Sequence, residues 1–180
     1  YIFEINENFT PNDWVSDYLP INYASCGLPV AYKMVYPRVE EIQPEQLDYI
    51  VAYVDSFEDA LYGDEFLDEA NGYRNFISVK SFVDFLITNE FSANYDSYGR
   101  STFLYKDKNG EINIGPAWDY DRAFAPWDVS GWVWENTHPE WPFPFWWDRL
   151  QDDEEWRNEV YCRYNDVRQH ILTDENITAF

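Results

Sequence analysis

Two aspartates, Asp96 and Asp119, stand on either side of a segment that is typical of a β-hairpin. Asn109-Gly110 lies between two strand-like runs, 101–106 and 111–114, and Asn-Gly supplies the positive φ angles that tight hairpin turns require. A hairpin returns the chain to where it began, so we expect both carboxylates to face one cleft. Two carboxylates held together attract a divalent cation or divide into acid and base roles. The block 94–121 therefore predicts metal-assisted chemistry.

An aspartate in a loop, followed by a hairpin and a second aspartate, is also the order of catalytic groups in enzymes that transfer phosphoryl groups. In the lower lobe of protein kinases, a loop aspartate orients the acceptor hydroxyl and an asparagine five residues later binds metal, as does a second aspartate after a hairpin. Such a reaction needs positioning, Mg²⁺ and charge neutralisation more than covalent help from the protein. Judged by residue type alone, Asp96 and Asp119 could equally be turn and cap residues, which are common roles of aspartate in loops.

A family resemblance favours the functional interpretation. The stretches 94–107 (NYDSYGRSTFLYKD) and 115–121 (GPAWDYD) resemble the catalytic segment of the CotH kinases, atypical kinases first met in the spore coat. Flanking stretches at 44–47, 57–63 and 145–150 extend the resemblance over most of the chain from about Tyr32 onward. By this resemblance Asp96 matches the catalytic aspartate and Asp119 the metal-binding aspartate. Trp118 would pack beside the site, and Asp121 is either a second metal ligand or a structural acceptor.

The chain departs from the family pattern in two places. Ser101 stands five residues after Asp96, where many relatives carry asparagine, and a serine hydroxyl is a weaker Mg²⁺ ligand than an amide carbonyl. Arg100, directly before it, is a candidate contact for phosphate. The glycine-rich loop and the lysine that grip ATP phosphates are absent, and Lys33 reads as a surface strand lysine. The resemblance thus implies that residues 1–180 are the C-terminal part of one kinase domain, with the nucleotide-gripping part in an upstream segment.

Two functions remain open at this point. The first is a kinase that uses ATP with Mg²⁺ or Mn²⁺ to phosphorylate Ser or Thr of a secreted, surface or coat protein. The second, which Ser101 favours, is a non-catalytic extracellular module that binds a protein or a carbohydrate, with Ca²⁺ in the acidic cleft. Its binding surface would be the tryptophans of the aromatic segment, Trp127, Trp132, Trp134 or Trp141.

Composition limits the setting. A chain of 180 residues suits one domain, and 46% hydrophobic with 21% aromatic residues indicates a globular fold. The net charge of −22 argues against nucleic acid and anionic membranes as partners, and no apolar run is long enough to span a bilayer. An extracellular, cell-surface or spore-surface location fits such a charge. For Cys26 and Cys162, a disulfide is possible, but buried free thiols are the favoured interpretation.

The strands and helices expected around these groups, together with the family resemblance, predict an α+β, kinase-like fold. Its parts would be a mostly helical lower lobe with the catalytic hairpin, and short strands from the hinge or upper-lobe end. Residues 1–5 and 29–36 read as strands, with a turn-rich loop over 6–27 between them. Apolar residues at three- and four-residue steps predict a helix from Pro44 to Gly63, and its acidic residues, Glu45, Asp48, Asp55, Glu58 and Asp59, form a solvated face.

Two further helices and an aromatic segment complete the pattern. Ser78 can cap a helix that runs to about Phe91 with Phe82, Phe85 and Leu86 on its inner face. Residues 124–147 are so rich in Trp, Phe and Pro that we expect an ordered, irregular segment in the core, although a stacking surface for sugars is the alternative. A last helix at about 153–172 is expected to bury Trp156, Val160, Tyr164, Val167 and Ile171.

Overall fold

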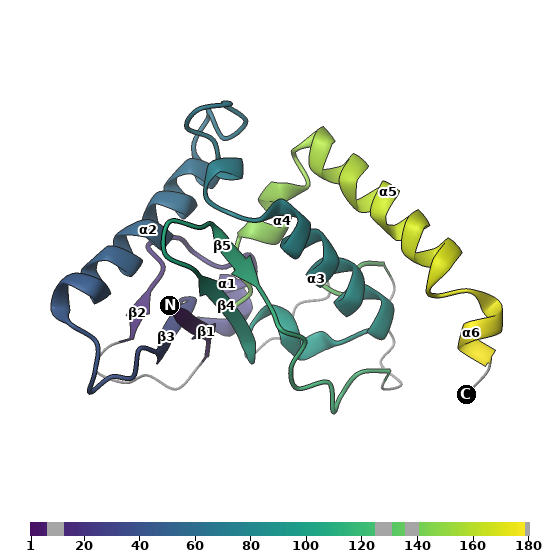
Figure 1. Ribbon diagram of the computed structural model, residues 1–180, viewed down its shortest axis with the longest axis horizontal. Helices are drawn as coiled ribbons and strands as arrows, with labels where there is room; N and C mark the ends of the chain where they lie inside the picture. Colours follow the sequence, from purple (N-terminus) through teal and green to yellow (C-terminus); the bar gives the residue numbers. More distant parts are fainter. Residues whose placement is uncertain (7–12, 125–130, 136–140, 179–180) are drawn as a thin grey trace.

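A five-stranded antiparallel sheet carries the hairpin (Figure 1). The computed structural model describes residues 1–6, 13–124, 131–135 and 141–178. Its strands, in the spatial order β2-β3-β1-β4-β5, are β1 (Ile2–Ile5), β2 (Trp14–Val15), β3 (Ala31–Tyr36), β4 (Thr102–Lys106) and β5 (Ile112–Ile114). The predicted strands and the hairpin are therefore confirmed. The expected loop over 6–27 also holds β2 and the short helix α1 (Tyr23–Cys26).

The register of the sheet separates a core face from a solvent face. Phe3 in β1 pairs with Met34 in β3 and with Leu104 in β4, and all three side chains are buried. Their neighbours along the strands, such as Val35 and Tyr105, are exposed on the other side. This alternation follows from the two-residue period of a strand, so one side of the sheet belongs to the core.

Helix α2 (Pro44–Tyr62) matches the predicted helix in both position and inner face. Pro44 occupies the first turn, and Gln43 and Gln46 form a capping box. Its buried apolar residues are Ile50, Val54, Phe57 and Leu61. One expectation is wrong, because Glu58 does not lie on a solvated face but is only 1% exposed. Its position on the helix places it on the inner side next to Phe57.

Glu58 is held in the core by three hydrogen-bond donors from distant parts of the chain. Its Oε1 accepts bonds from the Tyr32 hydroxyl (2.7 Å) and the Trp146 indole nitrogen (2.8 Å), and its Oε2 accepts one from Ser16 (2.8 Å). Burying an unpaired carboxyl is very unfavourable, so these bonds make its place in the core tolerable. The network joins α2, β3 and the helix that carries Trp146.

The aromatic run supplies the centre of the core. Helix α4 (Trp146–Leu150) places the Trp146 ring 5.1 Å from that of Phe57 in α2 and 6.2 Å from that of Phe82 in α3 (Val79–Ser92), measured between ring centroids. The core interpretation is confirmed for the buried aromatic residues Trp134, Trp141, Phe143, Phe145, Trp146 and Trp147. Trp132 is half-exposed, and Trp127 lies outside the described residues.

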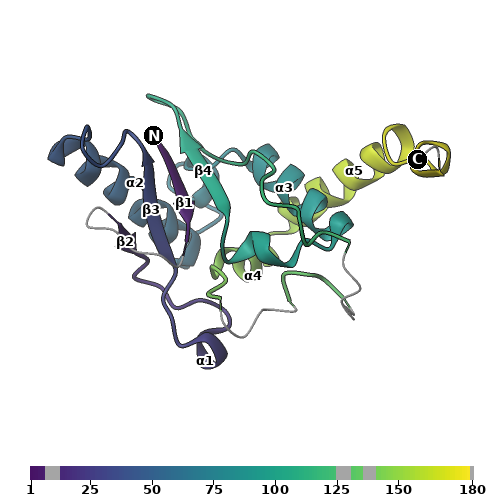
Figure 2. The ribbon, with the colours of Figure 1, turned by 90° about the horizontal axis from the view of Figure 1, so that it is seen from below.

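Helix α5 (Glu154–His170) begins as predicted, and the Asp153 carboxylate caps it by accepting a bond from the Glu155 backbone N–H (2.8 Å). The predicted burial is confirmed for Trp156 and in part for Val160, which packs against the core. It is wrong for Tyr164 and Ile171, which are 45% and 56% exposed. Figures 1 and 2 show the cause: α5 packs beside α3, where Arg163 pairs with Asp84, and its C-terminal part runs away from the sheet towards α6 (Asp174–Thr178).

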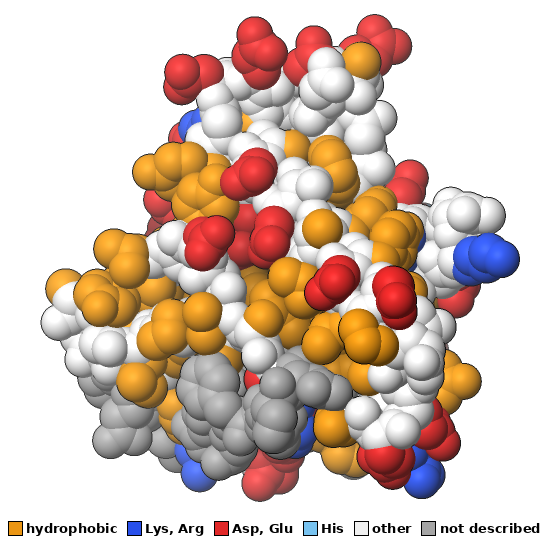
Figure 3. Space-filling model, turned by 90° about the vertical axis from the view of Figure 1, so that its left-hand side faces the viewer, with side chains coloured by type: hydrophobic (Ala, Val, Ile, Leu, Met, Phe, Trp, Pro, Cys, Tyr) orange, Lys and Arg blue, Asp and Glu red, His pale blue; other side chains and the backbone are white. Residues whose placement is uncertain are grey.

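The fold is thus α+β, with six α-helices and one antiparallel sheet in the described part of the chain, while a division into kinase-like lobes stays a prediction. Cys26 and Cys162 are free thiols, but neither is buried, which corrects the expectation of core thiols. Among the described helices, none has both the length and the apolar composition of a membrane span. Figure 3 shows acidic side chains spread over one face of the molecule, as the net charge of −22 requires.

We predict that Glu58 makes stability depend on pH. Burial raises the pKa of its carboxyl from 4.5 to about 7. The folded state therefore holds this proton more tightly than the unfolded state, and the resulting stability is present below about pH 4.5 and is lost by about pH 7. Glu58→Gln cannot titrate, so its free energy of unfolding relative to the parent should rise across this window, by up to about 3 kcal/mol.

Urea unfolding at several pH values measures this difference. Glu45→Gln, an exposed change on the same helix, is the matched control. Parallel pH profiles for Glu58→Gln and the parent would contradict the role assigned to the buried carboxyl.

Candidate active site

Asp96 is positioned by the end of helix α3. The helix stops at Ser92, and Ala93 adopts a left-handed conformation (φ 48°) that turns the chain into the 3₁₀-helix η2 (Tyr95–Tyr98), which contains Asp96. Buried Asn94 fixes this turn by donating from its side-chain amide to Asn89 and to Ser97. Asp96 is consequently held at a fixed place and is only 6% exposed.

The hairpin then brings Asp119 back towards the same region. Strands β4 and β5 pair Leu104 with Ile114, and Asn109 takes a positive φ of 61° in the connection between them, so the predicted hairpin is present. At the two ends of the hairpin, the Ser101 hydroxyl donates a hydrogen bond to Asp119 Oδ2 (3.1 Å). This bond ties the start of β4 to the loop after β5.

Both residues of this pair have unusual backbone angles. Ser101 has a φ of 52° and Asp119 a φ of 60°, which lie in the left-handed region that non-glycine residues seldom occupy. Such conformations carry a cost of about 1–3 kcal/mol each and are concentrated at functional sites. Ala93, Asn109 and Phe124 are the other described non-glycine residues with a positive φ.

Charged groups surround Asp96. Burial raises the pKa of its carboxyl, the positive charges of Arg122 and Arg100 oppose that rise, and the negative charges of Asp121 and Asp119 add to it. The nearest cation is Arg122, whose Nε lies 3.8 Å from Asp96 Oδ2. Asp96 Oδ1 is buried and has no hydrogen-bond partner among the described residues.

The other sequence-selected residues lie at the edge of this cluster. Arg100 lies over the Trp141 ring, with its guanidinium carbon 4.8 Å from the ring centroid. Trp118 is mostly exposed and contacts Phe103 edge-on, with 6.0 Å between ring centroids. Asp121 is exposed.

Sequence reasoning missed several residues of the cluster. Arg122 directly follows the motif that ends at Asp121, so its place in the chain was the available signal. Trp141 was assigned to the aromatic core without a role beside Arg100 and Arg122, although the guanidinium carbon of Arg122 lies 6.0 Å from its ring centroid. No pattern in the sequence indicates the bond from the Tyr120 hydroxyl to Asn89 Oδ1 (2.8 Å).

The oxygen atoms of these side chains suit a hard cation only if a bound phosphate group supplies further ligands. Within the described residues no group of three or more His, Cys, Asp or Glu side chains could hold a metal ion by itself. Asp119 and Ser101 offer a carboxylate and a hydroxyl side by side. Oxygen groups of this kind suit Mg²⁺ or Mn²⁺, which commonly take one or two carboxylates, substrate phosphates and water. The residues therefore fit a cation shared with a phosphate group.

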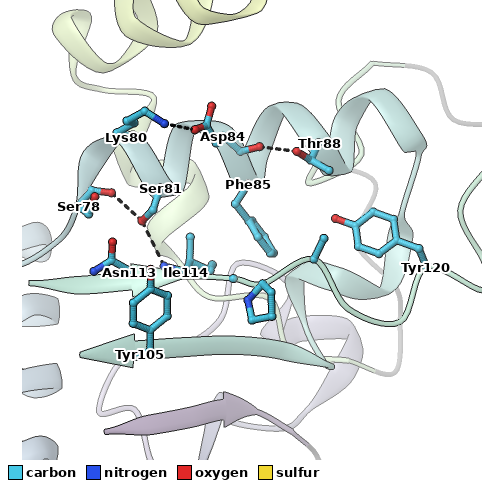
Figure 4. A pocket seen from close by; sticks show the side chains of 13 residues that line it. Ser78, Lys80, Ser81, Asp84, Phe85, Thr88, Tyr105, Asn113, Ile114 and Tyr120 are labelled. Carbon is cyan, nitrogen blue, oxygen red and sulfur yellow. Dashed lines mark hydrogen bonds and ion pairs between the residues drawn. The ribbon is translucent and has the colours of Figure 1, made fainter. Parts of the chain in front are cut away.

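A neighbouring cavity of about 380 Å³ lies between α3 and the hairpin (Figure 4). Its polar side chains are already engaged with one another: Lys80 pairs with Asp84, and Ser81 bonds both the Ser78 carbonyl and the Ile114 N–H. Tyr120 faces it from the loop that carries Asp119, but neither Asp96 nor Asp119 lines it. We therefore place the candidate site at the aspartates and not in this cavity.

Glu90 anchors the aromatic segment beside the site, and we predict that Glu90→Gln destabilises it. Glu90 Oε2 accepts from the Val133 N–H (2.6 Å), while Oε1 accepts from the Tyr98 hydroxyl (2.7 Å) and the Trp134 N–H (3.2 Å). The new amide nitrogen cannot accept a bond, so one buried N–H loses its partner at a cost of about 1–3 kcal/mol. Denaturant unfolding followed by tryptophan fluorescence measures this loss, and an unchanged midpoint would contradict the anchoring role.

Comparison with known proteins identifies the family. The family model described as CotH kinase protein matches residues 25–179, which is most of the chain and includes Asp96, Ser101 and Asp119. Searches of curated proteins and of solved structures gave no significant match. The resemblance that the motifs suggested is therefore confirmed, and the chain belongs to the CotH kinase family.

Proposed function

We propose that this chain carries the catalytic groups of an atypical protein kinase that transfers phosphate from ATP to Ser or Thr of a secreted, surface or coat protein. The observation that carries the proposal is the buried Asp96 carboxylate with one unpartnered oxygen, together with the bond from Ser101 to Asp119 at the open end of the hairpin. Membership of the CotH kinase family supports the same reaction class. A surface or extracellular location is part of this proposal.

Each residue has a distinct role in the proposed reaction. The Asp96 carboxylate accepts the hydrogen bond of the acceptor hydroxyl and takes its proton as the hydroxyl oxygen bonds to the γ-phosphorus of ATP, while the bond from phosphorus to the ADP oxygen breaks. Asp119 and Ser101 would hold Mg²⁺ or Mn²⁺, with Asp121 as a further acceptor, and the cation supplies charge neutralisation on the phosphates. Arg100 is a candidate phosphate contact, and Trp118 a candidate nucleotide contact.

Replacing either aspartate should abolish transfer. We expect Asp96→Ala to lower kcat by about 10²–10⁴-fold, the usual contribution of a general base, and Asp119→Ala to remove the metal-dependent activity. The assay measures transfer of the labelled γ-phosphate of ATP to a protein acceptor by the full-length natural polypeptide.

Asp48→Ala, an exposed change on α2, is the matched control and should retain parent activity. Parent-like transfer by both aspartate variants would refute the assignment.

Ser101→Asn tests the departure from the family pattern. Asparagine tolerates a left-handed conformation better than most residues, so the φ of 52° at this position accommodates it. Its amide carbonyl is also a better ligand for a hard cation than a hydroxyl. We therefore expect the variant to fold and to need less Mg²⁺ or Mn²⁺ for half-maximal transfer, and a titration of either ion against activity measures the change. An increased metal requirement would show that the serine is the preferred residue.

Ser101 also favours a second function, a non-catalytic extracellular module that binds a protein or a carbohydrate with Ca²⁺ at the acidic cluster. Burial of Trp134 and Trp141 leaves Trp132 as the exposed tryptophan among the described members of the proposed stacking surface. Calorimetry separates the two functions. Binding of nucleotide with metal supports the kinase, whereas glycan binding without a response to ATP supports the module.

A further inference from the structure

The Trp141 indole carries two guanidinium groups next to Asp96. The guanidinium carbon of Arg100 lies 4.8 Å from the ring centroid, and that of Arg122 lies 6.0 Å from it. A guanidinium over an indole face is attracted by the ring quadrupole and is held more firmly when the ring itself is fixed. In a chain with 12 basic and 34 acidic residues, this pair of cations is concentrated beside one buried carboxylate.

Trp141 is itself fixed by the N-terminal part of the chain. The side-chain amide of Asn22 donates to the Trp141 carbonyl (2.6 Å), and its oxygen accepts from the Phe143 N–H (3.0 Å). A backbone bond from the Ile21 N–H to the Phe143 carbonyl (3.0 Å) runs beside them. Both Asn22 and Trp141 are buried, so these bonds are protected from water and fix the backbone that carries the indole.

Arg122 approaches only one of the two oxygens of Asp96. Its Nε lies 3.8 Å from Oδ2, whereas Oδ1 has no hydrogen-bond partner among the described residues. The Arg122 side chain is half-exposed, and an ion pair of this length contributes little to stability. Its effect is therefore on the orientation of the carboxylate and not on the folding of the chain.

We propose, as an extension of the proposed kinase function, that Arg122 is a positioning residue. Held against the Trp141 ring, its guanidinium restrains the orientation of the Asp96 carboxylate, which is the base in the proposed reaction. Arg100 lies on the same ring, and Asp119 and Asp121 bring negative charge from the hairpin loop. Arg122 is thus the cation that restrains Asp96 for the reaction.

The kinetic test compares Arg122→Ala and Arg122→Lys in the full-length polypeptide, with Arg38→Ala as the matched control because Arg38 is exposed and far along the chain from the site. Small misplacement of a reacting group costs about 10²-fold in rate. We expect Arg122→Ala to lower kcat by about that factor with little change in the KM for the acceptor. The kcat of Arg122→Lys should lie between those of the parent and Arg122→Ala, because lysine keeps the positive charge but lacks the planar guanidinium group.

Added guanidinium ion should partly restore kcat of Arg122→Ala, an effect that a purely structural role would not produce. Parent-like kcat in Arg122→Ala, or a loss of kcat matched by Arg38→Ala, would overturn the proposal.

A second measurement does not need activity and separates this proposal from the kinase function. In NMR spectra, the Nε–H signal of Arg122 should move towards the position of free arginine in Asp96→Asn and in Trp141→Phe. An unchanged signal in both variants would overturn the positioning role whether or not the parent transfers phosphate. Absence of transfer in the parent, with the signal shifted as expected, would refute the kinase function and retain the restraint of Asp96 by Arg122.

Discussion

The hydrogen bond from Ser101 to Asp119 joins the two ends of the hairpin and holds Asp119 against the start of β4. Asp96 is fixed independently by the end of α3, through buried Asn94. The loop after β5 is tied to the same helix, because the Tyr120 hydroxyl donates to Oδ1 of buried Asn89, while Asp119 and Asp121 themselves are exposed. Pairing of β4 with β5 and these two side-chain bonds together set where the carboxylates of the loop lie. A small sheet and one helix thus determine the geometry of a candidate site that is built mainly from loops.

The sequence allowed the local elements to be predicted because their causes are local. Asn109 occurs at the hairpin turn with the positive φ that the Asn-Gly pair predicts. Helices α2 and α3 follow from apolar residues at three- and four-residue steps, which bury one side of a helix whatever it packs against. Glu58 shows the limit of this reasoning. As a glutamate it is predicted to be exposed to solvent. The hydrogen-bond donors that stabilise it in the core come from β3 and α4, and the sequence of the helix does not reveal them.

The same limit applies to α5 and to the site. The apolar residues Tyr164 and Ile171 have helical spacing, yet α5 leaves the body of the protein before they can be buried. The aspartates of the site were found because a motif with fixed order carries them. The sequence did not indicate that Arg122 lies near Trp141. The backbone at Trp141 is held by Asn22, which is more than a hundred positions away in the chain. Tertiary contacts of this range leave no pattern in a single sequence.

The left-handed angles at Ser101 and Asp119 also restrict how this site can evolve. A β-branched residue at either position would meet steric conflict with its own backbone, whereas glycine, asparagine and aspartate tolerate these angles best. Exchange between serine and asparagine at position 101 therefore requires no movement of the main chain. The backbone at these two positions therefore admits a short set of small polar side chains without a change in the shape of the hairpin.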